Sequence, residues 1–245
     1  MTKRFDNKVA IITAGGSGIG AATERRFTQE GASVVIADLS GKRAEEVTKG
    51  IVANGGKAVC LKMDASDPEG IQATIKLALD TYGRLDVLFN NAGAAEVGAL
   101  EDTTLESWNR VMAVTLTSTF LGMKYCLPIM RKQGKGTIIN TASVSGTAGD
   151  YGLSSYNAAK AGVINLTRAA AIEEHSDLVA DCRERRQQSF IRLADLAAEK
   201  LEHALHVAAQ QYRKTEGGVQ PFTRGDGRAR KIRVLRDVRN PGGVS

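Results

Sequence analysis

Three side chains near the middle of the chain have the types and the spacing to move a proton at neutral pH. Tyr156 and Lys160 lie four residues apart, and Ser143 precedes Tyr156 by thirteen residues. On a helix, residues four apart share a face, with Cβ atoms about 5–6 Å apart, so the phenol and the ammonium would face one cleft. A phenol has a pKa of about 10, which a neighbouring cation lowers. We therefore predict an acid/base tyrosine, a lysine that lowers its pKa, and a serine that holds the substrate oxygen.

A glycine-rich turn near the N-terminus has the context of a dinucleotide site. Gly15–Gly20 (GGSGIG) lies between an apolar, β-branched run and a helical stretch. Glycine lets the backbone turn tightly and lets a pyrophosphate approach the helix N-terminus, where free N–H groups and the dipole attract anions. A glycine cluster alone is most often a plain turn, but this strand–turn–helix context favours dinucleotide binding. The expected contacts are Ser17, Gly18, Ile19 and Gly20.

Acidic residues follow the next two predicted strands. A carboxylate at Asp38 can accept hydrogen bonds from an adenosine ribose and would repel a 2′-phosphate. The nearest cations are Lys42 and Arg43, outside the glycine turn. NAD is therefore favoured over NADP as the cofactor. Asp64 and Ala65 follow the third predicted strand and are assigned to the same site, although Asp64 could equally cap its own loop.

The elements that must position these residues alternate between strands and helices. Apolar runs predict strands at Lys8–Thr13, Ser33–Ala37, Ala58–Met63, Leu85–Phe89 and Gly136–Asn140. Helices are predicted at Gly18–Glu30, Gly41–Asn54, Asp67–Tyr82, Leu105–Lys132 and Tyr151–Glu174. Pro128 is expected to kink or end the fourth helix. Buried strands interleaved with helices imply an α/β fold, a doubly wound, Rossmann-like parallel sheet with helices on both faces and a ligand crevice at the carboxyl ends of its strands.

Four motifs carry a resemblance to the short-chain dehydrogenase/reductase family over residues 1–175. The family's T-G-x-x-x-G-x-G, N-N-A-G, catalytic Ser and Y-x-x-x-K occur here in the same order. They read Thr13–Gly20, Asn90–Gly93, Ser143 and Tyr156–Lys160. The resemblance implies that Tyr156 is the general acid/base and that Ser143 orients the carbonyl or alcohol. It also implies that Lys160 binds the nicotinamide ribose, and that Asn91 supports the central strands and lines the cofactor floor.

Two positions inside the matched region depart from the family pattern. Ala14 stands where the family usually has its first glycine. Its methyl group is tolerable in the turn if φ is negative there, so we expect only a modest loss of fit. Thr115 stands where the family commonly has an asparagine that holds a water in a proton relay to the lysine. Threonine keeps a hydroxyl but loses the reach of the amide. We expect proton release to be slower but not abolished.

Residues 176–245 do not match the family, whose pattern would continue with two more strands, a proline–glycine turn and a substrate-covering segment. Strands six and seven are not evident: Asp181–Gln188 is polar where a buried strand is expected. Phe190–Tyr212 has helical periodicity, Lys231–Val238 could be an edge strand or nothing, and the tail from Gly217 is rich in Gly and Arg. The chain thus divides into an NAD-binding domain, 1–175, and a non-family segment with a poorly ordered tail, 176–245.

A shift of the coding frame near Glu174 is one hypothesis for this abrupt change. Read one base later, codons for Cys182–Gln187 can encode Ala/Val-Val-Asn-Ala-Val-Ser, the kind of string that precedes the family's proline–glycine turn. The reading fails at Gln188, whose shifted codon cannot encode proline. An uninterrupted frame in independent sequencing reads would contradict the hypothesis.

Charge and composition limit the partners. Residues 1–175 hold 19 Lys and Arg against 18 Asp and Glu, whereas residues 176–245 hold 14 against 9. A basic end could neutralise nucleic-acid phosphates, but no aromatic side chains interleave its arginines, which favours a solvated tail. No apolar run is long enough for a membrane-spanning helix, and no apolar signal core for secretion precedes the first strand. Three scattered cysteines argue against disulfides and a zinc site. A reduced cytoplasmic setting, no membrane partner and no metal are expected.

The residues and the resemblance together imply an NAD-dependent oxidoreductase. It would transfer a hydride between nicotinamide and a small or cyclic secondary alcohol or its ketone, with Gly146–Leu153 beside the substrate. The resemblance further implies homodimers or homotetramers built on the long helices at 105–132 and 151–174. Two alternatives stay open: a catalytically impaired, dinucleotide-binding pseudoenzyme, and an unstable product whose fifth strand exposes an apolar edge.

Overall fold

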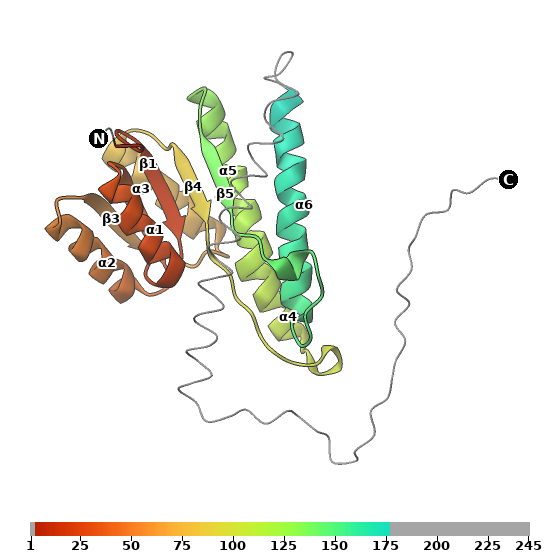
Figure 1. Cartoon of the computed structure of the whole chain (residues 1–245). Coiled ribbons are helices and arrows are strands. Elements are labelled where there is room, and N and C mark those ends of the chain that lie inside the picture. Colours follow the sequence, from red (N-terminus) through yellow and green to blue (C-terminus); the bar gives the residue numbers. More distant parts are fainter. Residues whose placement is uncertain (1–2, 177–245) are drawn as a thin grey trace. The chain divides into compact units, whose positions relative to one another are not determined.

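The computed structural model describes residues 3–176, which include a five-stranded parallel sheet (Figure 1). The strands are β1 (Val9–Thr13), β2 (Ser33–Asp38), β3 (Lys57–Lys62), β4 (Val87–Asn90) and β5 (Thr137–Asn140). Their spatial order is β3-β2-β1-β4-β5, so the chain reverses its direction of winding between β1 and β4. Ligands of such sheets bind at this switch point, outside the carboxyl ends of the strands. The predicted doubly wound α/β fold is confirmed.

The helices of this part of the chain follow the predicted order. They are α1 (Gly18–Gln29), α2 (Gly41–Ala53), α3 (Pro68–Tyr82), α4 (Leu105–Met112), α5 (Ser118–Lys132) and α6 (Ser154–Ser176), with short 3₁₀ turns η1 (Leu100–Asp102) and η3 (Val144–Gly146). Asp67 caps α3 by accepting from two backbone N–H groups, and Gly83 ends it with φ 74°. These are the expected start and stop signals of a helix.

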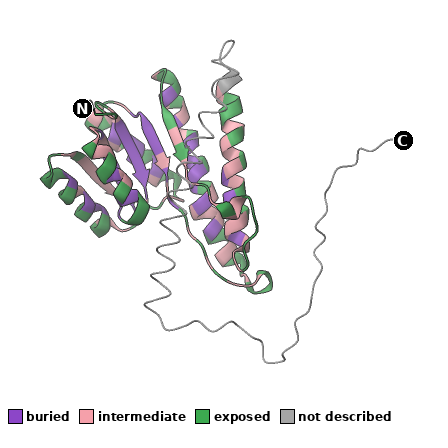
Figure 2. Cartoon of the chain, viewed as in Figure 1, coloured by how far each residue is buried: buried purple, intermediate pink, exposed green. Residues whose placement is uncertain are grey.

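Two apolar layers hold the helices on opposite faces of the sheet. On one face, Ile12 and Ile36 belong to the cluster that includes Ala21 of α1 and Val47 of α2. On the other, Ile11 and Val35 belong to the cluster that includes side chains of α3 and α5. Adjacent strand residues point to opposite faces, so unbroken apolar strands are buried by helices on both sides. Figure 2 shows this burial concentrated on the central strands.

The long helix predicted at Leu105–Lys132 is interrupted, but not at Pro128. A π-helical turn, η2 (Ala113–Thr117), separates α4 from α5, and α5 continues through Pro128 to Lys132. Of the two predicted effects of Pro128, a kink or an end of the helix, the end does not occur there. Pro128 is exposed, so water can bind the carbonyl group that its missing N–H leaves free. Single π-helical turns inside helices are frequent at functional sites.

The sequence also predicted elements in the segment after residue 176. Asp181–Gln188, Phe190–Tyr212 and Lys231–Val238 lie outside the described residues. Within residues 3–176, no helix is both long and apolar enough to cross a bilayer.

Candidate active site

The predicted site residues follow the carboxyl ends of the strands and therefore lie along one edge of the sheet. The parallel registers pair Thr13 with Ala37, Asp38 with Lys62 and Asn90 with Asn140. The glycine turn follows β1, Asp64 follows β3 and Ser143 follows β5. One edge thus brings together the residues assigned to the dinucleotide and those assigned to the chemistry.

The glycine turn is held by Asp38 at the end of β2. The Asp38 side chain is 3% exposed, and its Oδ2 accepts from the Gly16 backbone N–H at 2.9 Å. Its Oδ1 accepts from the Ser40 N–H at 2.8 Å and from Arg43 Nη2 at 3.3 Å. A Cβ on Gly16 would stand 2.9 Å from Asp38 Cγ, so a side chain there would push the carboxylate away. Asp38 therefore shapes the turn, a role that its sequence position did not reveal.

The start of α1 is open to a ligand. Ser17 is the N-cap residue of α1, and its side chain makes no capping hydrogen bond. Ser17, Gly18 and Ile19 are all exposed, and Gly20 is buried against the turn. The first N–H groups of a helix have no partner within the helix and attract anions. This end of α1 therefore suits a pyrophosphate.

Ala14, just before the glycines, adopts a conformation that a methyl group disfavours. Its φ is 52°, in the left-handed region. The assumption of a negative φ, on which the expected modest loss of fit depended, is wrong. The turn folds back so closely that a Cβ on Gly20 would overlap the Ala14 carbonyl oxygen. A side chain in this region costs about 1–2 kcal/mol, which glycine would avoid.

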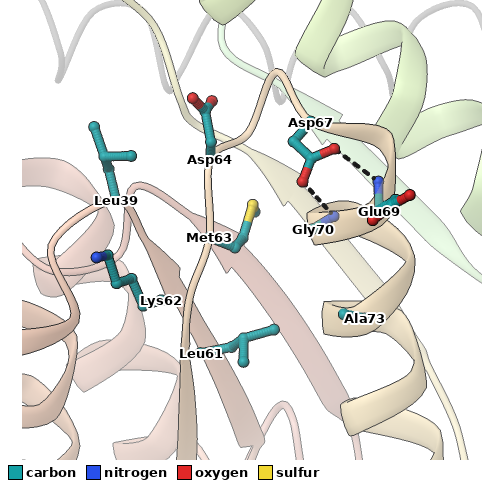
Figure 3. Close-up of a pocket in the computed structure, with 9 residues that line it drawn as sticks. All are labelled: Leu39, Leu61, Lys62, Met63, Asp64, Asp67, Glu69, Gly70 and Ala73. Atoms are coloured by element: carbon teal, nitrogen blue, oxygen red, sulfur yellow. Dashed lines mark hydrogen bonds between the residues drawn. The ribbon is translucent and has the colours of Figure 1, made fainter.

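A hollow of about 450 Å³ lies beside the ends of β2 and β3. Figure 3 shows Leu39, Met63 and Asp64 on one side and the start of α3 on the other. Asp64 Oδ1 accepts from the Ser66 N–H at 2.8 Å and the Ser66 hydroxyl at 2.7 Å. Asp64 thus caps its own loop, the second of the two predicted alternatives, and still lines the hollow. Ala65 is half-buried and packs on the core.

Thr13 ties the glycine turn to the Asn90–Gly93 loop. Its hydroxyl accepts from the N–H groups of Asn91 and Ala92, both at 3.0 Å. The Asn91 side-chain amide donates back to the Thr13 carbonyl at 3.1 Å. Asn91 therefore joins the end of β1 to the loop that follows β4.

Lys160 and Tyr156 lie close together near the start of α6. The Lys160 side chain is 3% exposed, and its Nζ donates to the Thr141 carbonyl at 2.7 Å. The same Nζ lies 5.6 Å from the centroid of the Tyr156 ring. Ser143, after β5, accepts from the Ser145 N–H at 3.2 Å and donates to the Ser145 hydroxyl at 3.1 Å. The geometry brings a phenol and an ammonium together in a largely buried space.

Burial is the main influence on the protonation of both groups. It raises the pKa of Tyr156, which the Ser143 hydroxyl lowers in part and Asp150 raises further. Burial also lowers the pKa of Lys160 to about 8. The pKa of Tyr156 is thus raised in this structure, not lowered as predicted, and burial is the largest cause.

Thr115 is fully buried in η2 and is bonded to the neighbouring loop. Its hydroxyl accepts from the Ala94 N–H at 3.0 Å and donates to the Ala94 carbonyl at 3.1 Å. A Cβ on Gly93 would stand 3.7 Å from Lys160 Nζ and 3.8 Å from Thr115 Oγ1, so both atoms face the same space. Thr115 therefore fixes the loop beside the lysine.

Comparison with known proteins identifies the family. The chain belongs to the short-chain dehydrogenase family, whose model matches residues 8–180. It is therefore placed among oxidoreductases.

Similar proteins include enzymes named for secondary and cyclic alcohols. Cyclohexanol dehydrogenase of Acinetobacter sp. (strain SE19) is 44% identical over 174 residues, which cover 71% of this chain and 69% of that protein. Meso-2,3-butanediol dehydrogenase of Serratia marcescens is 41% identical over 174 residues, 71% of this chain and 68% of that protein. The chain matches about two thirds of the length of these proteins.

Solved structures give the same fold. The crystal structure of levodione reductase has a TM-score of 0.67 and 38% identity over 69% of this chain and 67% of that one. A short-chain dehydrogenase/reductase from Burkholderia phymatum, in complex with NAD, has a TM-score of 0.67 and 33% identity over 69% of this chain and 60% of that one.

Proposed function

We propose that this chain is an NAD-dependent dehydrogenase that transfers a hydride between nicotinamide and a small or cyclic secondary alcohol or its ketone. The observation that carries the proposal is the buried Lys160 ammonium 5.6 Å from the Tyr156 ring. The open start of α1 lies on the same edge of the sheet. A lysine beside a phenol at the carboxyl ends of the strands suits acid/base chemistry.

The residues of the site fit a dinucleotide. Gly16 leaves room where a side chain would collide with Asp38, and the first turn of α1 offers free N–H groups. The Asp38 carboxylate can accept from ribose hydroxyls and would repel a 2′-phosphate, while Arg43 already contacts it. These features support NAD rather than NADP. When bound, the nicotinamide supplies the hydride acceptor.

The chain's own groups would handle the alcohol and its proton. The Ser143 hydroxyl can donate to the substrate oxygen and orient it toward Tyr156. The Tyr156 oxygen can then accept the alcohol proton during oxidation or return it during reduction. Lys160, fixed by the Thr141 carbonyl, offers the cation that favours the ionised phenol.

Apolar residues around the site suggest the class of substrate. Val97, Val144 and Tyr151 are exposed on the loops that follow β4 and β5. The Gly98 N–H donates to the Gly152 carbonyl at 2.9 Å, which joins these two loops. An apolar rim around a polar centre suits a small ring or chain that carries one secondary hydroxyl. The names of the similar enzymes, cyclohexanol and butanediol dehydrogenases, agree with this inference.

Removal of the phenolic oxygen tests the proposal. Formation of NADH from NAD and cyclohexanol or 2,3-butanediol is followed by absorbance for the wild type and for Tyr156→Phe. We expect a loss of about 10²–10⁴-fold in kcat/KM, the contribution of a positioned acid/base. Tyr125→Phe is the matched control, because Tyr125 lies on α5 and packs against the core, and it should keep the wild-type rate. Equal rates for Tyr156→Phe and wild type would overturn the assignment.

A second candidate is a protein that binds the dinucleotide without turnover. It is favoured by β5, an edge strand of the described sheet, in which Ile139 is 40% exposed. NADH binding without oxidation of any alcohol in a panel would support it.

A homo-oligomer is also inferred. Leu105 of α4, Phe120 of α5 and Ile172 of α6 expose apolar surface on the long helices. Light scattering should give at least twice the mass of one chain, and a monomer at micromolar concentration would contradict the inference.

A further inference from the structure

Glu24 of α1 is a buried carboxyl group that the proposed chemistry does not use. Its side chain is 0% exposed, and neither carboxyl oxygen has a hydrogen-bond partner within residues 3–176. A Cβ on Gly15 would overlap Glu24 Oε1 and stand 3.1 Å from a methyl group of Ile36. The carboxyl group therefore lies directly against the glycine turn, between α1 and β2. Buried polar groups without a partner are rare and costly.

The next glycine places a second carboxyl group close by. Gly16 donates its N–H to Asp38 Oδ2 at 2.9 Å, so Glu24 and Asp38 flank two consecutive glycines of one turn. The charged groups that act on Glu24 are Asp38 from β2 and Arg25 from its own helix. Arg43 of α2 is paired with Asp38.

These surroundings keep Glu24 uncharged at neutral pH. Its pKa is raised to about 9, chiefly by burial and also by Asp38, while Arg25 lowers it only in part. Ionisation would set two carboxylates against one short turn, with little solvent to screen them, close to where a pyrophosphate would bind. The turn could relieve that repulsion only by moving.

We propose that Glu24 is a positioning residue for the dinucleotide. As a neutral acid it supports the Gly15–Gly16 turn and leaves Asp38 as the only negative charge there. Ionisation of Glu24 weakens dinucleotide binding. This inference rests on the proposed dinucleotide site. Glu24 acts through the turn and through Asp38, without touching the reacting atoms.

The test is the pH dependence of dinucleotide affinity. NADH is titrated into the full chain between pH 6 and 10, and its fluorescence gives the dissociation constant for the wild type, Glu24→Gln and Glu45→Gln. Glu45 is an exposed carboxylate on α2 and serves as the matched control. For the wild type, the constant should rise about tenfold more between pH 8 and 10 than for Glu24→Gln, as expected when only the neutral form of a group with this pKa binds. Glu45→Gln should follow the wild type.

The two proposals fail in different ways. No NADH binding by the wild type at any pH would contradict the dinucleotide site itself. Binding with the same pH profile in the wild type and Glu24→Gln would overturn the role of Glu24 alone. Thermal melts at each pH establish that the variants are folded, and Glu24→Met replaces Glu24→Gln if the amide prevents folding.

A spectroscopic measurement on the wild type is independent of every variant. The infrared carbonyl band of a protonated carboxyl group should be present at pH 7 and should disappear between pH 8 and 10. Its absence at pH 7 would overturn the proposal.

Discussion

The half of the site that follows β1 and β2 and the half that follows β5 differ in how firmly their strands are enclosed. Every residue of β1 is buried, and so are all residues of β2 after the first, whereas β5 alternates between exposed and half-buried residues. The glycine turn and Asp38 belong to the first half, and Ser143, Tyr156 and Lys160 belong to the second. The proposed dinucleotide binding and the proposed chemistry would therefore have separate structural support. A change in one half should therefore affect one of these properties more than the other.

Each half also contains a buried ionisable group whose pKa has shifted so that its neutral form is favoured. For Glu24, the folded-state pKa of about 9 lies above its ordinary value, so stability is lost as pH rises from about 4.5 to 9. For Lys160, the folded-state pKa of about 8 lies below its ordinary value, so stability is lost as pH falls from about 10.5 to 8. Both groups reduce stability at pH 7, which is typical of residues retained for function.

Lys160→Met should produce the largest effect, and mainly in the catalytic half. We expect kcat/KM to fall by about 10²–10⁴-fold, because the phenol loses its cation. The free energy of unfolding at pH 7 should rise, by on the order of 3 kcal/mol at most, because no ammonium is buried. Urea denaturation at pH 7 and 10 measures this gain, which should shrink at the higher pH. Lys49→Met, on exposed surface, should change neither property; a variant less stable than wild type at pH 7 would contradict the account.

Asp38→Ser should affect the dinucleotide half. Loss of charged hydrogen bonds worth about 1.5–3 kcal/mol predicts NADH binding about 10–100-fold weaker. NADPH should bind more tightly than to the wild type, because Arg43 loses its partner and can meet a 2′-phosphate. Fluorescence titration of both cofactors measures the ratio. An unchanged NADH-to-NADPH preference would show that Asp38 does not select the cofactor.

Thr115→Asn should increase turnover by up to about tenfold, because the amide would restore a proton relay to Lys160. This gain is a small part of what acid/base catalysis contributes. NADH affinity should stay the same, since Thr115 lies in η2, away from the glycine turn. Steady-state kinetics in water and deuterium oxide measure the effect. Thr115→Val is the control, which removes both hydrogen bonds to Ala94 and should lose stability. A slower Thr115→Asn variant with wild-type stability would contradict the relay.

Ala14→Gly should have the smallest effect and act through stability. Relief of the strain at φ 52° exceeds the extra flexibility of glycine in the unfolded chain, for a net gain of about 0.5–1 kcal/mol. Urea denaturation measures it. Asn7→Gly is the matched control at φ 57°, where asparagine is already tolerated and no gain is expected. Equal changes in the two variants would mean that the methyl group is not strained.

The sequence predicted the elements and their order better than the details of the site. Apolar strands, glycine stops and the Asp67–Pro68 helix start reflect local rules, and the structure follows them. The φ of Ala14, the π-helical turn at Thr115 and the burial of Glu24 depend on packing between distant segments, which no local pattern contains. The raised pKa of Tyr156 was missed for the same reason, since the depth of burial becomes known only once α6 is packed.

The shift of the coding frame proposed for residues 176–245 stays a hypothesis, which the nucleotide sequence of the gene can test. Nucleotide sequence around codon 174 should reveal one inserted or deleted base relative to related genes. An open frame shared by those genes would contradict it.

Transfer of a labelled hydride is the most direct test of the proposed reaction between NAD and a secondary alcohol. The full chain is incubated with NAD and cyclohexanol that carries deuterium on the carbinol carbon, and the reduced cofactor is analysed by mass spectrometry. The account predicts one deuterium in the NADH formed by the wild type and almost no labelled NADH with Tyr156→Phe. Failure of the wild type to form deuterated NADH, in a preparation that binds NADH, would contradict it.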